Sequence, residues 1–178
     1  SGYIPSMVTA ANDAIDTLLK LNKHNRISVI LYSGNAQNGD SNLNHATTVL
    51  PLGRYTAEGK DYIEYTGTLH DTKVKTGNTV RKEDGTKITS VEKTTRGGTY
   101  IQSGLYLAYK EFESVKNDTV IDNSLIQGGT KRMPIITLMS DGSPTVATTS
   151  YTNIGTSNHG DGGTNTNTIT FLTQLTAA

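Results

Sequence analysis

Two polar residues in this sequence could bind a metal ion together, Thr99 and Asp141. Thr99 ends a Gly-Gly-Thr stretch that stands before an amphipathic segment, and Asp141 follows a run of apolar residues. A threonine hydroxyl and an aspartate carboxylate are hard oxygen donors, which Mg²⁺ and Ca²⁺ prefer, and Mg²⁺ keeps several waters and so needs few protein groups. Such a site leaves a coordination position that an acidic group of a partner can fill.

Each of the two residues also has an ordinary structural interpretation. Asp141-Gly142 is a common turn dipeptide, and a threonine before a helix can cap it by accepting a backbone N–H. The interpretation as a metal site depends on both residues occurring in this order and beside these elements. In open α/β sheets, ligands bind at the carboxyl ends of the strands, which is where we expect Asp141.

The elements that must position these residues follow from hydrophobic periodicity. Apolar residues at helical spacing predict a helix over residues 4–21, and β-branched runs predict strands over residues 26–32 and 46–52. A second helix is predicted from about residue 99 to 114. Residues 133–140 form a nearly uninterrupted apolar run, which predicts a strand buried on both faces. This order of helices and strands predicts an α/β fold with a doubly wound, Rossmann-like sheet.

Residues 56–95 have a different pattern. Short segments in which polar and apolar residues alternate are separated by turn signals at Gly67, Gly77 and Glu83-Asp84-Gly85. The pattern predicts a β-hairpin arm inserted into the α/β frame. Because this arm is too polar to have a core of its own, we expect it to project from the frame or to lie against its surface.

The composition excludes several classes of protein. The chain has 16 Lys and Arg and 16 Asp and Glu, so no basic excess is available to bind nucleic acid. The sequence contains no run of about 20 apolar residues, which a membrane-spanning helix requires, so we do not expect this segment to insert into a membrane. The absence of cysteine excludes disulfides and thiolate catalysis. No nucleophile motif, phosphate loop or acid pair beside a histidine is present, so we do not expect an enzyme.

The two candidate residues lie in motifs that resemble a known family. Residues 96–105 and 135–142, with the sequences RGGTYIQSGL and IITLMSDG, resemble the second and third loops of von Willebrand factor A domains. The resemblance implies a metal-ion-dependent adhesion site in which Thr99 is the threonine of the second loop and Asp141 the aspartate of the third. It implies Mg²⁺, with Ca²⁺ or Mn²⁺ as alternatives.

The resemblance extends over most of the chain. Residues 10–15 resemble the family's first helix and residues 26–33 its second strand, whereas the arm at 56–95 lies outside it. Residues 1–178 are therefore expected to form a partial domain of this family. The family's first loop, Asp-x-Ser-x-Ser, does not occur in these residues. Three of the five usual ligands are thus missing, and we expect metal binding by this chain to be weak or absent.

Within the family, the sequence is similar to Gram-positive surface adhesins and pilus-tip proteins. The Val-Leu-Pro-Leu-Gly-Arg-Tyr-Thr segment at 49–56, followed by a polar β-arm, carries this similarity. It implies a module on the bacterial cell surface or cell wall that binds a host matrix or cell-surface protein, with other pilus subunits as further partners. The alternative is a structural pilus or cell-wall subunit whose metal site is empty or vestigial.

Overall fold

The computed structural model describes seven stretches of the 178-residue chain. Asp141 and all residues after it lie outside them, as do residues 34–45 and the two glycines before Thr99. The described stretches are residues 3–33, 46–68, 71–94, 99–115, 126–127, 130–131 and 134–140.

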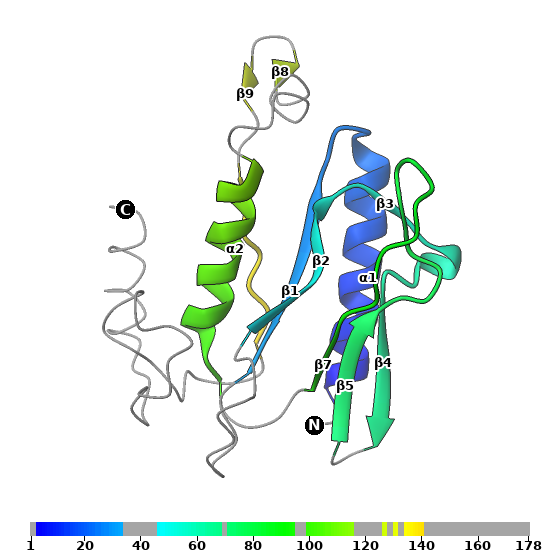
Figure 1. The fold of residues 1–178 in the computed structure, drawn as a ribbon, viewed down its shortest axis with the longest axis vertical. Coiled ribbons are helices and arrows are strands. Elements are labelled where there is room, and N and C mark those ends of the chain that lie inside the picture. The colour runs from blue at the N-terminus through cyan, green and yellow to red at the C-terminus, as the bar shows by residue number, and fades with distance from the viewer. Residues whose placement is uncertain are drawn as a thin grey trace.

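The described residues form two helices, a 3-10 turn and short strands (Figure 1). The helices are α1 (Ile4–Leu21) and α2 (Ile101–Val115), and the 3-10 turn is η1 (Glu58–Lys60). The strands are β1 (Ile27–Tyr32), β2 (Ala46–Gly53), β3 (Tyr55–Thr56), β4 (Ile63–Thr68), β5 (Asp71–Thr76), β6 (Arg81–Lys82), β7 (Glu92–Thr94), β8 (Ile126–Gln127) and β9 (Thr130–Lys131).

Helix α1 has the start and the buried face that its sequence predicts. Pro5 lies in the first turn, where its missing N–H costs no helical hydrogen bond. Ile15 and Leu19 are buried at a spacing of four residues and face the main core. Lys20 lies in the last turn, where a cation is favoured by the helix dipole. The predicted helix over residues 4–21 is confirmed.

Strands β1 and β2 pair antiparallel and lie between the two helices (Figure 1). On one side, Val49 and Leu50 of β2 are fully buried in the cluster that contains the apolar face of α1. On the other side, α2 contacts both strands, and its buried Ile101 and Leu105 pack with Tyr32 of β1. The frame is therefore a two-stranded ladder covered by one helix on each face.

The arm, residues 56–95, does not project from this frame. Its main sheet has the strand order β4-β5-β7, and β4 packs against α1. Tyr62, Ile63, Val74 and Val80 are buried in the same cluster as Val49 of β2. The expectation missed this packing because the arm's few apolar residues add to a core that the frame already has, instead of forming one of their own.

The apolar run before Asp141 differs most from its prediction. Residues 134–140 are exposed and have no assigned strand, although a strand buried on both faces was predicted. Ile135 is 75% exposed, and Ile136, Leu138 and Met139 are 49%, 48% and 40% exposed. The predicted burial is wrong for this chain because no strand among the described residues forms a ladder with this segment, whose apolar side chains are left exposed.

The mixture of helices and strands agrees with the predicted α/β class in general. All strand pairs among the described residues are antiparallel, so these residues do not show the parallel, doubly wound sheet that was predicted.

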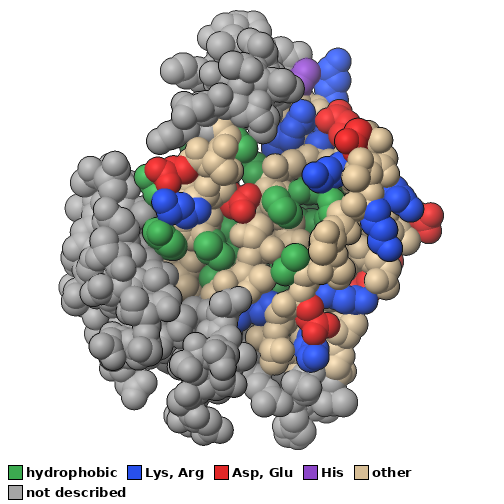
Figure 2. Space-filling view, viewed as in Figure 1, with side chains coloured by type: hydrophobic (Ala, Val, Ile, Leu, Met, Phe, Trp, Pro, Cys, Tyr) green, Lys and Arg blue, Asp and Glu red, His purple; other side chains and the backbone are tan. Residues whose placement is uncertain are grey.

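Neither α1 nor α2 is long and apolar enough to cross a membrane. Figure 2 shows basic and acidic side chains interspersed over the described part of one face.

Candidate functional site

Thr99 lies two residues before Ile101, the first residue of α2, close to where the sequence predicted that helix to begin. Its side chain is half-buried, and the next residue, Tyr100, is fully buried. The Ser103 hydroxyl donates a hydrogen bond of 2.8 Å to the Tyr100 carbonyl and so stabilises the first turn of the helix. Burial raises the pKa of Tyr100 to about 12 from its usual 10. Thr99 is thus followed directly by a fully buried tyrosine.

Tyr32, the last residue of β1, brings two further elements to the same place. Its hydroxyl donates a hydrogen bond of 2.8 Å to the Met139 carbonyl, near the end of the 134–140 segment. Its ring lies against the first turn of α2, where a methyl group on Gly104 would be 2.9 Å from Tyr32 Cδ1. The C-terminal ends of β1 and of segment 134–140 therefore meet beside the N-terminal turn of α2.

The predicted metal ligands are described only in part. Asp141 follows Ser140, the last residue of the described segment, and lies outside the described residues. The described stretches contain no group of three His, Cys, Asp or Glu side chains that could hold a metal ion. The described residues therefore include one predicted ligand, Thr99, and the chain position just before the second, Ser140.

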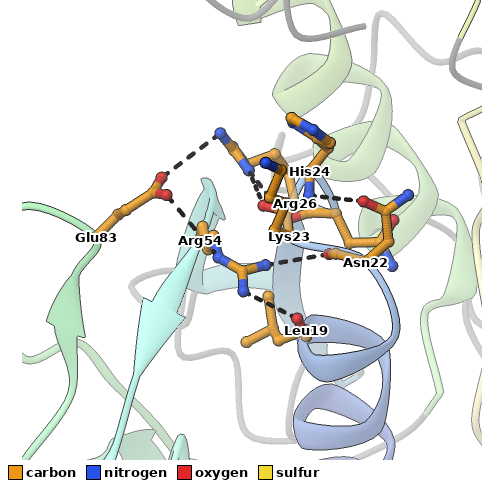
Figure 3. A network of polar contacts seen from close by, with 8 residues as sticks. Leu19, Asn22, Lys23, His24, Arg26, Arg54 and Glu83 are labelled. Atoms are coloured by element: carbon orange, nitrogen blue, oxygen red, sulfur yellow. Dashed lines mark hydrogen bonds and ion pairs between the residues drawn. The ribbon is translucent and has the colours of Figure 1, made fainter. Parts of the chain in front are cut away.

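A second polar site lies at the opposite end of β1 and was not predicted from the sequence. Figure 3 shows Arg54, which follows β2, beside the C-terminal end of α1. Arg54 Nη2 donates to the Leu19 carbonyl at 3.0 Å, and Nη1 donates to the Asn22 carbonyl at 3.2 Å. These bonds satisfy carbonyl groups that the end of a helix leaves without an intrahelical partner.

Arg26 lies beside Arg54 and is held in the same way (Figure 3). Its Nη1 donates to the carbonyls of Lys23 and Asn25 at 3.4 and 3.2 Å. Glu83, from the turn of the arm after β6, places a carboxylate oxygen 3.6 Å from Arg26 Nη2 and another 4.0 Å from Arg54 Nε. No sequence signal joins these three residues, because they come from three separate elements.

An open depression of about 590 Å³ adjoins this triad. The end of β2 and the segment after it line one side, and residues of the arm from Lys82 to Val91 line the other. Tyr55 and Ile88 give it an apolar part, and Arg54, Lys82 and Lys87 give it cationic groups. The depression thus lies at the junction between the arm and the frame.

Comparison with known proteins gives no match of any kind. No family model matches the chain, no curated protein matches it, and neither does any solved structure. The resemblance to von Willebrand factor A domains therefore remains a prediction from the motif residues around Thr99 and Asp141.

Proposed function

We propose that this chain is part of a cell-surface adhesion module, which binds an acidic group of a host matrix or cell-surface protein through a metal site that includes Thr99 and Asp141. The observation that supports the proposal most is the meeting of three element ends. The hydrogen bond from Tyr32 to Met139 and the contact of Tyr32 with Gly104 bring the end of segment 134–140 to the start of α2.

In the proposed site, the chain's own groups would do two things. The Thr99 hydroxyl would offer one oxygen ligand, and the Asp141 carboxylate would offer negative charge to the ion, directly or through a water molecule. A bound Mg²⁺ would supply the positive charge that attracts the partner's carboxylate. Thr99 is suited to this role because the buried Tyr100 and the Ser103 hydrogen bond fix the backbone next to it.

The proposal includes the doubly wound arrangement. The C-terminal ends of β1 and of segment 134–140 meet, although the segment forms no ladder with β1, and parallel neighbouring strands bring their C-terminal ends to one edge of a sheet in the same way. The helices on the two faces of the β1–β2 ladder also agree with this architecture. The proposed location is the bacterial cell surface or cell wall, where other pilus subunits would be further partners.

Isothermal titration of the chain with Mg²⁺ tests the proposal. We expect saturable binding with a Kd of about 1 mM or weaker, because two ligands form only part of a hexacoordinate site. Asp141→Asn should abolish it, whereas Asp13→Asn, which removes the same charge from an exposed side chain of α1, should not. Equal binding of Mg²⁺ by Asp141→Asn and Asp13→Asn would refute the metal site and leave the scaffold alternative.

A further inference from the structure

We propose that Arg26 and Arg54 form a binding site for an oxyanion, the carboxylate of an acidic peptide or a phosphate group, and that Glu83 occupies it as a built-in competitor. This site is independent of the proposed metal site. Arg26 directly precedes β1, and Tyr32 ends it, so the two sites are separated by about 20 Å, the length of six extended residues.

The two guanidinium groups are held in place without any help from Glu83. Each of them donates two hydrogen bonds to backbone carbonyls at the end of α1 or in the link to β1. Their side chains are only 19% and 22% exposed, so little conformational freedom remains to be lost when an anion binds. Arg26 Nη2 and Arg54 Nε both lie toward the same carboxylate and can serve one oxyanion together (Figure 3).

Glu83 fills this position loosely. Its oxygens are 3.6 and 4.0 Å from the two nitrogens, whereas charge-assisted hydrogen bonds are about 2.7–2.9 Å long. Its side chain is 61% exposed. The turn that carries it is closed by its own bonds, from Lys82 N to the Thr86 carbonyl at 2.8 Å and from Gly85 N to the Lys82 carbonyl at 2.9 Å. Glu83 can therefore leave the arginines while the turn keeps its structure.

The charges around the site favour an anion. Two arginines face one carboxylate, which leaves the triad with an excess of one positive charge. Lys82 and Lys87 line the adjoining depression, and the Asp84 carboxylate there accepts a hydrogen bond from Thr86 N at 2.9 Å, so it is engaged within the turn. The depression of about 590 Å³ has room for the remainder of a small ligand next to the arginines.

The strength of the ion pair determines how strongly Glu83 competes with an external anion for the two arginines. Exposed ion pairs of this kind shift an equilibrium by a factor of about two to five. Glu83 therefore occupies the arginines most of the time, and an external anion must displace it. Removing the Glu83 charge should lower the apparent Kd for an anion by about three- to sixfold.

The test is a titration of ¹⁵N-labelled protein at constant ionic strength, followed by the Nε–H signals of the arginines. The probes are inorganic phosphate and N-acetylglutamate amide, which separate the phosphate source from the carboxylate source. The variants are Glu83→Gln, the matched control Glu58→Gln, which removes the same charge elsewhere on the arm, and Glu83→Gln with Arg54→Lys. Lysine keeps the charge but lacks the planar group that serves two acceptors.

We expect the Arg54 Nε–H signal to shift with at least one probe, and Glu83→Gln to bind that probe about three- to sixfold more tightly than the wild type and Glu58→Gln. The added Arg54→Lys change should cancel the gain. The proposal is overturned if neither probe shifts the Arg54 signal, if Glu83→Gln gains no more than Glu58→Gln, or if the gain survives in the double variant.

Discussion

Replacing Asn12 with alanine should loosen the arm from α1. The Asn12 amide donates to the Ile63 carbonyl at 2.9 Å and accepts from Ile63 N at 3.0 Å. It thus acts as the hydrogen-bonding partner of Ile63 at the edge of β4 that faces α1. Alanine would leave two buried backbone groups without partners, at a cost of about 1–3 kcal/mol each. We therefore expect Asn12→Ala to lower the free energy of unfolding by about 2–6 kcal/mol.

Urea unfolding, followed by far-ultraviolet circular dichroism, measures this loss. The matched control is Asn25→Ala, which removes one exposed hydrogen bond of 2.7 Å to the Leu18 carbonyl and should cost about 1 kcal/mol or less. If Asn12→Ala costs no more than Asn25→Ala, then the amide does not anchor the arm, and the account of how arm and frame share one core is wrong.

Three further predictions concern burial, close packing and exposed apolar surface. Burial lowers the pKa of Lys93 to about 8 from its usual 10.5, so the unfolded chain binds more protons between these values and stability rises with pH there. Between pH 8 and pH 9.5, urea unfolding should show the wild type's free energy of unfolding rising by up to about 2 kcal/mol more than that of Lys93→Met. The same change with pH in both proteins would contradict this prediction. Gly77→Ala should cost about 3 kcal/mol or more in thermal unfolding, because its Cβ would lie 1.8 Å from the Asp61 carbonyl oxygen. Gly85→Ala, with a φ of +84° but no atom within 4 Å, should cost only about 1–2 kcal/mol, and a reversed order would refute the packing argument. We expect the chain to self-associate through the exposed apolar residues of segment 134–140, and Ile135→Ser to reduce this association in sedimentation velocity, because Ile135 is 75% exposed; unchanged association would exclude this surface.

The local elements could be predicted from the sequence because their signals are local. The spacing of apolar residues over 4–21 identifies α1, and the β-branched runs identify β1 and β2 within a residue or two of their bounds. The start of α2 was predicted from the glycines and threonine before it, and the helix begins at Ile101, two residues after Thr99. Each of these signals extends over only a few neighbouring residues.

The sequence could not show how distant segments meet. The apolar run at 134–140 has the composition of a buried strand, but burial requires neighbouring strands and helices, which periodicity in the run does not specify. The Asn12–Ile63 contact joins residues 51 positions apart through a side chain that fits a helix surface equally well. The triad of Arg26, Arg54 and Glu83 could not be predicted for the same reason.

The central claim is that Thr99 and the residues at the end of segment 134–140 share a metal site. Mn²⁺ tests it most directly, because a bound paramagnetic ion broadens the amide signals of nearby residues. We predict that substoichiometric Mn²⁺ broadens the amide signals of Thr99 and Ser140 first, that EDTA restores them, and that Thr99→Ala removes the effect. Broadening that leaves Thr99 and Ser140 unchanged, or that persists in Thr99→Ala, would contradict the account.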